Sequence, residues 1–410
     1  MQEQKLSISV ENIAPQNGSS LAPVWFGFHN GQFKTIEVGQ KASAGLEQLA
    51  EDGDPNGVIR EFTAAGKGTV QGALLGSLGG PFAPNDRIQT TVSIDPRAAG
   101  SQYFSYASMI LPSNDQFLAN ADPKDVEIFN DRGRFLGADF IINTTDAWDA
   151  GTEVNDEIPA NTAFFGQTVS NTGTPENGVV TSAPGFKPRG SGGILDSTRF
   201  SNADFLAPGY QFARVRVANL VEGGAGDDRL VGTDAPDDIF AGEGNNTVNG
   251  RGGNDRVTSG SGQDTITTSG GNDVINSGGG NDVIFSRGGD DVIDAGDGNN
   301  RITAGDGKDI ITGGNGNDWI SGGDGDDIIN AGLGRDRVYA GYGNDTFVLN
   351  AGDGQVRIFD YENVDKFSLG SGLIRESISV RIQGENTILS SGSDVLAILQ
   401  DIQTTQVSFA

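Results

Sequence analysis

The sequence predicts an all-β protein, in which an antiparallel β-sandwich is followed by a parallel roll of nonapeptide repeats and a C-terminal β cap. Three observations predict this fold class. Short apolar, β-rich runs alternate with turn residues over residues 1–222. A nine-residue pattern then repeats without a break over residues 223–348. Strand-like alternation returns over residues 349–410, so we expect three domains with these boundaries.

The composition excludes several classes of function. The chain has 410 residues, 63 of them Gly, with no Cys, one His, and 55 acidic against 27 basic side chains, a net charge of −28. A disulfide framework, a cysteine nucleophile and a zinc site of several His or Cys ligands are therefore excluded. The acidic excess argues against nucleic acid or an anionic membrane surface as partner. No apolar run reaches the roughly 18 residues of a membrane span.

The first domain, residues 1–222, is expected to be a sandwich of short strands. Turn residues separate the apolar runs at 6–10, 92–94, 103–111, 140–142 and 212–217, which is typical of an antiparallel sandwich. One helix is expected over residues 42–50, with Ser43 near its N-cap. Residues 166–193 are rich in Gly, Ser, Thr and Pro and are expected to form a long loop.

The second domain consists of 14 consecutive nonapeptides. Position four is Gly in 13 of them, position six is Asp in twelve and Asn in two, and position eight is apolar in all 14. Glycine at positions one, two and four lets the backbone turn through positive φ. Positions seven to nine form a short strand whose eighth side chain points inward. Two nonapeptides therefore make one coil of turn, strand, turn and strand, and 14 make a stack of seven coils.

The position-six side chains predict rows of calcium sites. Carboxylates beside the carbonyl oxygens of glycine turns are hard ligands, which suit Ca²⁺ better than Zn²⁺ or copper. The array carries 22 acidic and 8 basic residues. One buried aliphatic side chain per repeat stabilises less than the ordering of nine residues costs. We therefore expect the array to be unfolded without Ca²⁺ and to fold on binding it. The predicted ligands are Asp228, Asp237, Asp255, Asp264, Asp273, Asp282, Asp291, Asp309, Asp318, Asp327, Asp336 and Asp345.

Some repeats are expected to bind calcium weakly. Asn246 and Asn300 keep a position-six oxygen but lose its charge. The repeat at residues 232–240 departs from the pattern at positions two, four and five. If each ion lies between one turn and the next turn on the same side, 14 turns give at most about 12 sites. A flexible Gly/Asp-rich linker is the alternative, but it does not explain 14 apolar eighth positions.

These repeats resemble the RTX (repeat-in-toxin) nonapeptide Gly-Gly-x-Gly-x-Asp-x-U-x, where U is a large apolar residue. The resemblance implies a parallel β-roll that binds Ca²⁺ between successive turns. It also implies type I secretion through an uncleaved C-terminal signal, and hence a secreted, extracellular or cell-surface location. Residues 394–401 and 407–410 resemble such export tails. Residues 349–410 are also placed to cap the last open coil.

Four stretches of the first domain resemble the spondin N-terminal domain. They are residues 21–30, 39–54, 105–117 and 148–155, and the Pro-Ser-Asn-Asp turn ending at Asp115 and the Asp149-Ala-Gly-Thr motif are the most specific. The resemblance implies a β-sandwich with one bound Ca²⁺, found in extracellular-matrix and adhesion proteins. Matched to that family, the ligands would be Asp95, Asp115 and Asp149. From the residues alone, each Asp could instead cap its own turn.

Together these features predict a secreted, non-enzymatic calcium-binding adhesion or matrix protein whose partner is a cell-surface glycan, a protein or another copy of the chain. An extracellular hydrolase with an RTX export tail is the alternative, and a passive calcium buffer is a third possibility. The chain has no Gly-x-Ser-x-Gly elbow, and one His excludes His-Glu-x-x-His. We expect His29 to be a structural residue. The acidic residues Glu47, Glu51, Asp52 and Asp54 are expected to form a solvated helix face.

Overall fold

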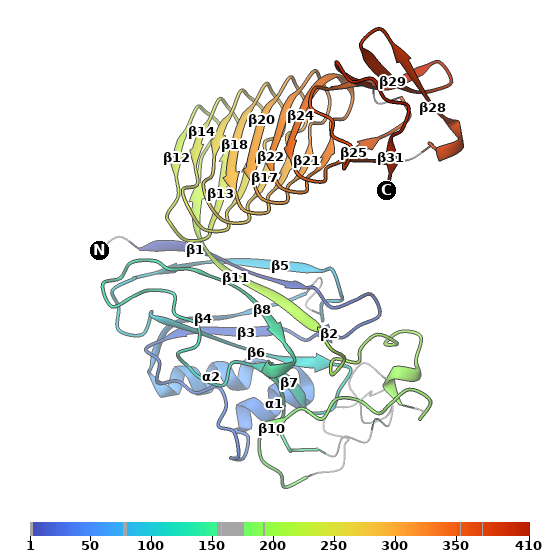
Figure 1. The fold of residues 1–410 in the computed structure, drawn as a ribbon. Helices are drawn as coiled ribbons and strands as arrows, with labels where there is room; N and C mark the ends of the chain where they lie inside the picture. The colour runs from blue at the N-terminus through green and yellow to red at the C-terminus, as the bar shows by residue number, and fades with distance from the viewer. Residues whose placement is uncertain are drawn as a thin grey trace. The chain divides into compact units, whose positions relative to one another are not determined.

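The structure, a computed structural model of the chain, describes residues 3–76, 80–153, 157, 176–191, 193–352, 354–370 and 372–410. The chain divides into two compact units, Met1–Ala218 and Asn219–Ala410. Strands dominate both units (Figure 1), which confirms the predicted all-β class. Of the loop expected over residues 166–193, the part 166–175 and residue 192 lie outside the described residues; the described part is irregular apart from one two-residue strand.

The first unit contains two antiparallel sheets. One has the order β5-β1-β11, and β8 also pairs with β11. Its strands are β1 (Gln4–Asn12), β5 (Arg87–Ile94), β8 (Ala138–Asn143) and β11 (Gln211–Glu222). The other has the order β10-β9-β7-β6-β3-β4, and β2 pairs with β6. Its strands are β2 (Ser20–Leu21), β3 (Val24–His29), β4 (Gly68–Leu74), β6 (Tyr103–Leu111), β7 (Gln116–Ala119), β9 (Ala147–Asp149) and β10 (Thr181–Ser182). All five strands expected in this region are present.

Two helices cover the second of these sheets on the side away from the first (Figure 1). Helix α1 (Ala44–Asp52) begins at Ser43, whose Oγ accepts a hydrogen bond from the backbone N–H of Leu46, so the predicted N-cap is confirmed. Helix α2 (Asn56–Ala65) follows it and was not predicted. Strand β3 is buried along its whole length because it lies between the helices and the first sheet. No described helix is long and apolar enough to cross a membrane.

The second unit is a parallel β-solenoid. Each strand pairs with the strand 18 residues later, as in Ile239↔Val257 and Ile266↔Ile284, so two nonapeptides make one coil as predicted. Figure 1 shows the two rows of strands as successive coils. One sheet holds β13 (Asp237–Gly242), β15 (Arg256–Ser259), β17 (Val274–Asn276), β19 (Val292–Asp294), β21 (Ile310–Thr312), β23 (Ile328–Asn330) and β25 (Thr346–Leu349). The other holds β12 (Arg229–Val231), β14 (Thr247–Asn249), β16 (Thr265–Thr267), β18 (Val283–Gly288), β20 (Arg301–Asp306), β22 (Trp319–Asp324) and β24 (Gly334–Tyr342). The position-eight side chains of the two sheets form one buried core.

The solenoid continues past the last nonapeptide and is then capped. Strands β26 (Gly354–Ile358) and β27 (Lys366–Leu369) extend the two sheets in parallel register. Strands β28 (Ile378–Gln383), β29 (Asn386–Ser391) and β30 (Asp394–Leu399) form an antiparallel meander, and β30 pairs with β26. Strand β31 (Ser408–Phe409) pairs with β27. These elements form the C-terminal β cap that the sequence predicts.

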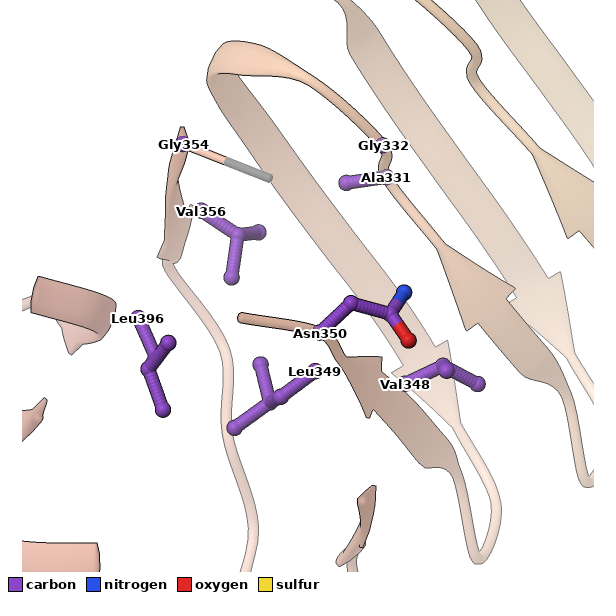
Figure 2. A pocket seen from close by; sticks show the side chains of 8 residues that line it. All are labelled: Ala331, Gly332, Val348, Leu349, Asn350, Gly354, Val356 and Leu396. Atoms are coloured by element: carbon purple, nitrogen blue, oxygen red, sulfur yellow. The ribbon is translucent and has the colours of Figure 1, made fainter. Parts of the chain in front are cut away.

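The junction between array and cap is closely packed. A void of about 20 Å³ lies there (Figure 2), which is room for about one water molecule. Figure 2 shows Val356 and Leu396 from the cap strands facing Leu349 across this void. The void is therefore a packing defect and not a ligand site.

Candidate calcium sites

Glycine determines the geometry of the solenoid turns. In the repeat at residues 322–330, Gly323 and Gly325 have φ values of 131° and 142°, which residues with side chains rarely adopt. A Cβ atom on either would lie 2.0 or 1.8 Å from the carbonyl oxygen of the matching residue one coil earlier. Turns of successive coils therefore stack backbone on backbone, with their carbonyl oxygens close together.

The position-six residues form two hydrogen-bonded ladders, one for each row of turns. In both ladders the backbone N–H of one residue donates to Oδ1 of the residue one coil later, at N···O distances of 2.7–3.0 Å. All members except Asp228 are at most 2% exposed. One ladder consists of Asp237, Asp255, Asp273, Asp291, Asp309, Asp327 and Asp345. The other consists of Asp228, Asn246, Asp264, Asp282, Asn300, Asp318 and Asp336.

The second carboxylate oxygen, Oδ2, lacks a hydrogen-bond donor in the later repeats. It is buried and accepts no hydrogen bond from the described residues in Asp309, Asp318, Asp327, Asp336 and Asp345. Burial raises the pKa of the Asp318 carboxyl to about 7, and that of Asp309 to about 6. Burial raises the pKa of Asp327 to about 7, and the like charges of Asp309 and Asp345 add to this effect. An ionised oxygen in such a place is unfavourable unless a cation compensates it.

The two asparagines show what surrounds this oxygen. The amide nitrogen Nδ2 of Asn246 donates to the carbonyl oxygens of Gly242 and Gly244 in its own turn, both at 3.2 Å. Nδ2 of Asn300 likewise donates to the carbonyl oxygens of Ala295 and Gly313, both at 3.4 Å. Aspartate has the same shape with a second oxygen in place of that nitrogen. An Asp in these ladders therefore directs its Oδ2 atom toward the carbonyl oxygens of the turns. A cation bound between these oxygens would stabilise that arrangement.

The position-one glycines leave room beside the carboxylate. A Cβ atom on Gly322 would lie 2.3 Å from Oδ2 of Asp327, and one on Gly313 would lie 2.8 Å from Oδ2 of Asp318. Carboxylate and carbonyl oxygens in a flexible set are the ligands that Ca²⁺ takes. The residues present therefore fit calcium, with carboxylates from the ladder and carbonyl oxygens from the glycine turns.

The first repeats differ, because protein donors already serve their second oxygen. Oδ2 of Asp228 accepts a hydrogen bond from the backbone N–H of Gly224 at 2.7 Å. Oδ2 of Asp237 accepts from the N–H and hydroxyl of Thr233, and Oδ2 of Asp264 from the hydroxyl of Ser259. Asp237 belongs to the repeat expected to bind poorly, and the structure supplies a local reason.

No cluster of three or more Asp, Glu, His or Cys side chains placed to hold a metal ion occurs in the described ranges of the chain. The ladders bring carboxylates together two at a time, one from each of two adjacent coils. A complete Ca²⁺ coordination sphere of six to eight oxygens would therefore need the backbone carbonyls of the turns.

Two features of the turns were not predicted. Asp365 continues one ladder, since its Oδ1 accepts a hydrogen bond from the backbone N–H of Asp345 at 3.1 Å, although it lies 20 residues later and not 18. Its spacing to Phe367 repeats the Asp-x-apolar pattern, so a search that tolerated a two-residue slip would have found it. Position five forms a second, exposed ladder, in which Asn317 N–H donates to Asn299 Oδ1 at 2.7 Å. Position five is Asp, Asn or Gln in 11 of the 14 repeats, which is the signal for this ladder.

In the first unit the structure brings together two of the three acidic residues predicted there. Asp115 is fully buried; its Oδ2 accepts hydrogen bonds from the N–H groups of Thr152 and Glu153, whereas its Oδ1 accepts none from the described residues. Burial, and then the negative charge of Asp149, raises the pKa of Asp115 to about 8. Asp149 is 7% exposed, and its Oδ1 accepts from the N–H of Gly151 at 2.7 Å.

The structure places Asp95 elsewhere. It follows β5 in the other sheet, and its Oδ1 accepts a hydrogen bond from the N–H of Arg97, so it caps its own turn. Nearer to Asp115 is the carboxylate of Glu153, whose charge raises the pKa of Asp115. Glu51 interacts with Thr152 and Glu153, and burial raises its pKa to about 7. Glu51 is 6% exposed, so the expectation that this acidic run is a solvated face is wrong for that residue.

His29 contacts a serine inside the first unit. It is fully buried, its Nε2 lies 2.9 Å from Oγ of Ser105, and its Nδ1 accepts a hydrogen bond from the N–H of Gly31 at 3.0 Å. Since Nδ1 accepts, the proton of the neutral ring lies on Nε2, which donates to Ser105. This is the reverse of the polarity in which a histidine takes a proton from a serine nucleophile. Burial also lowers the pKa of His29 to about 4.

Comparison with known proteins identifies the repeats. The RTX calcium-binding nonapeptide repeat family (4 copies) matches residues 222–257, 231–266, 249–284, 258–293, 285–320 and 321–356. Residues 222–356 therefore consist of RTX calcium-binding repeats folded as a β-solenoid, as predicted. No curated protein matches the chain.

Among solved structures, the extracellular lipase LipA from Serratia marcescens is similar at 18% identity. The match covers 47% of this chain and 42% of the lipase, with a TM-score of 0.19. The chain thus matches less than half of the lipase's length, and a likeness this weak implies nothing about activity.

Proposed function

We propose that this chain is a secreted, non-enzymatic calcium-binding protein of the cell surface or extracellular matrix, and that its repeat array folds on meeting Ca²⁺ outside the cell. The observation that carries the proposal is the row of buried Oδ2 atoms without a donor, in contrast to the asparagine amides that bond the turn carbonyls. Without a cation, the ionised aspartates of each ladder would repel one another, because they are buried where water screens charge poorly. With Ca²⁺ between the turns, both the charges and the oxygens are compensated.

Calcium concentration then acts as the signal of location. Extracellular calcium modules bind at roughly 10⁻⁴–10⁻³ M. A site of that affinity is empty inside a cell and filled outside it, so the array would pass through a secretion channel unfolded. Metal binding supplies the folding free energy that the thin core lacks. Type I secretion through the C-terminal segment fits this sequence of events.

The first unit is proposed to be the adhesive module, on its resemblance to the spondin N-terminal domain. Asp115 and Asp149 would hold one further Ca²⁺, with Glu153 as the nearest third carboxylate in place of Asp95. Supporting this site is the buried Oδ1 of Asp115, which accepts no hydrogen bond from the described residues. Its partner would be a cell-surface glycan, a protein or a second copy of the chain.

A hydrolase with an RTX export tail is the second candidate, and the contact between His29 and Ser105 is the observation that favours it. The tautomer of His29, its full burial and its lowered pKa all oppose a role as general base. A panel of ester and polysaccharide substrates tests this candidate. Turnover that disappears in Ser105→Ala, with the fold retained, would replace the adhesion proposal by the hydrolase.

The decisive experiment is circular dichroism of the full chain in chelator and after addition of Ca²⁺, followed by sizing of the loaded form. We expect a gain of β-structure with a midpoint in the 10⁻⁴–10⁻³ M range. A β signal for the array that is already complete in chelator would contradict calcium-driven folding. A passive calcium buffer would bind ions without assembling or adhering to a glycan surface.

A further inference from the structure

The outer face of one solenoid sheet, from β20 to β26, carries a row of aromatic and basic side chains. The guanidinium of Arg301 lies 4.1 Å from the ring centroid of Trp319, which lies 5.8 Å from the ring of Tyr339. Tyr339 in turn stacks on Phe359 with centroids 4.8 Å apart and rings nearly parallel. These four side chains contact one another in a continuous row along the stacking direction, with Arg301 over the face of Trp319 and Tyr339 against the face of Phe359.

Three arginines lie beside this row. Arg335 and Arg337 are exposed on the outer face of β24, and Arg337 is in register with Arg357 on β26. With Gln355 and the edge of Asp336 they line a hollow of about 220 Å³. None of the three guanidinium groups forms an ion pair with any described residue.

Such a cluster is unusual in this chain. The array has only 8 basic residues against 22 acidic ones. Three of the basic residues, Arg301, Arg335 and Arg337, lie on this one face. Like charges on neighbouring strands, about 4.8 Å apart, repel each other. An anion relieves that repulsion, and arginine binds carboxylate or sulfate through two parallel hydrogen bonds.

We propose that this face binds an acidic polysaccharide, whose carboxylate or sulfate groups pair with Arg335, Arg337 and Arg357 while its sugar rings contact the exposed parts of Trp319 and Tyr339. The inference rests on the proposed extracellular adhesion role and adds to it a second binding surface, on the solenoid, besides the module proposed for the first unit. Flat amphipathic rings beside charged donors suit a ligand with both apolar faces and anionic groups. The net charge of −28 opposes nucleic acid and acidic polysaccharide alike beyond this patch, so a nucleic acid is the competing ligand in the test.

The test measures binding of the Ca²⁺-loaded full chain to hyaluronate and to dextran sulfate, with neutral dextran as the uncharged control. The two acidic polymers separate carboxylate from sulfate recognition. We expect binding to at least one of them, and a loss of about tenfold or more in the double variant Arg337→Gln/Arg357→Gln. Arg229→Gln is the matched control, because Arg229 is an exposed position-seven residue in the first coil of the same sheet, and it should bind like the parent.

Several results would overturn the inference. They are equal binding to dextran, an unchanged affinity in the double variant, tighter binding to oligothymidylate, or an arginine-dependent self-association with no polymer bound. Circular dichroism and calcium counting on the same samples separate failure of this inference from failure of the proposed function. A chain that folds with Ca²⁺ but does not bind the polymers would contradict only the polysaccharide site. If the double variant does not fold, Arg335→Gln alone serves, and its affinity must fall for the inference to stand.

Discussion

At the scale of single residues, the difference between an Asp and an Asn in the ladders is the difference between a site that needs an ion and one that does not. Asn246 bonds two turn carbonyls with its own amide, whereas Asp327 directs a second oxygen that accepts no hydrogen bond from the described residues. One atom therefore decides whether a rung is held by metal or by protein.

Exchanging that atom should change the ion count. In Asp327→Asn we expect about one Ca²⁺ fewer per chain, and less loss of structure in chelator, because the new amide can bond the turn carbonyls. Isothermal titration calorimetry gives the count. The reverse change, Asn246→Asp, is the matched control and should add about one ion. If the parent and both variants bind the same number of Ca²⁺ ions, the position-six residues of the ladders are not calcium ligands.

Protons should partly replace the metal. The pKa of Asp318 is raised to about 7 in the folded state, against 3.8 for the ordinary group, so folding of the metal-free array takes up protons. Stability from this source is present in full below pH 4 and is lost as pH rises through 7. In chelator we expect more β-structure at pH 5 than at pH 8, and a Ca²⁺ midpoint at least about tenfold higher at pH 5. Circular dichroism titrations at both values check this; a midpoint independent of pH would contradict it.

At the scale of elements, the glycines determine the turns, and the apolar residue at position eight determines the strands. The nine-residue period predicted both, together with the 18-residue coil, because the repeat places the same side chain at the same place 14 times. It did not predict β26 and β27, since the spacing slips to 20 residues there and the glycine pattern ends. Helix α2 was missed for a different reason: its N-cap residue, Pro55, makes no side-chain capping hydrogen bond of the kind that marked α1.

Within the first unit, local sequence predicted five strands but only part of the acidic site. Asp115 and Asp149 meet because β7 pairs with β9, with Gln116 opposite Asp149, and that pairing joins segments about 30 residues apart. Composition and periodicity do not reveal such a contact. The same limit explains Glu51, which an acidic run predicted to be solvated but which the packing of α1 buries.

A turn glycine should be far more sensitive than one outside the stack. In Gly325→Ala the new Cβ would meet the carbonyl of Gly307 at 1.8 Å and would require a φ of 142°. Strain of this kind costs about 1–3 kcal/mol before the clash is relieved, so the Ca²⁺ midpoint should rise several-fold. Gly226→Ala, the same position in the first repeat, meets nothing within 4 Å and should behave as the parent does. Equal midpoints for the two variants would mean that the turns do not stack as described.

At the scale of the whole molecule, the two units are stabilised by different terms. The first has a core of large aromatic side chains, among them Trp25, Phe28 and Phe104. The second buries one aliphatic side chain per strand between two rows of carboxylates. Hydrophobic burial is insensitive to chelators, whereas compensation of charge by Ca²⁺ is not.

Chelation should therefore dissect the chain. In EGTA we expect limited proteolysis to remove residues 219–410 and to leave a resistant core from the first unit; in Ca²⁺ both units should resist. Mass spectrometry of the fragments locates the boundary. Loss of both units together in chelator would show that the first unit also depends on the metal, and Asp115→Asn would then test whether its own acidic site is responsible.

The pairing of each strand with the one 18 residues later also restricts how such a chain can lengthen. Inserting a single nonapeptide would transfer every later strand to the opposite sheet and would move Trp319 and Arg337 to the other side of the solenoid. Inserting two nonapeptides keeps every later side chain on the same face of the same sheet and shifts it by one coil along the solenoid. Viable length variants among homologous arrays should accordingly differ by even numbers of nonapeptides wherever an outward surface is put to use.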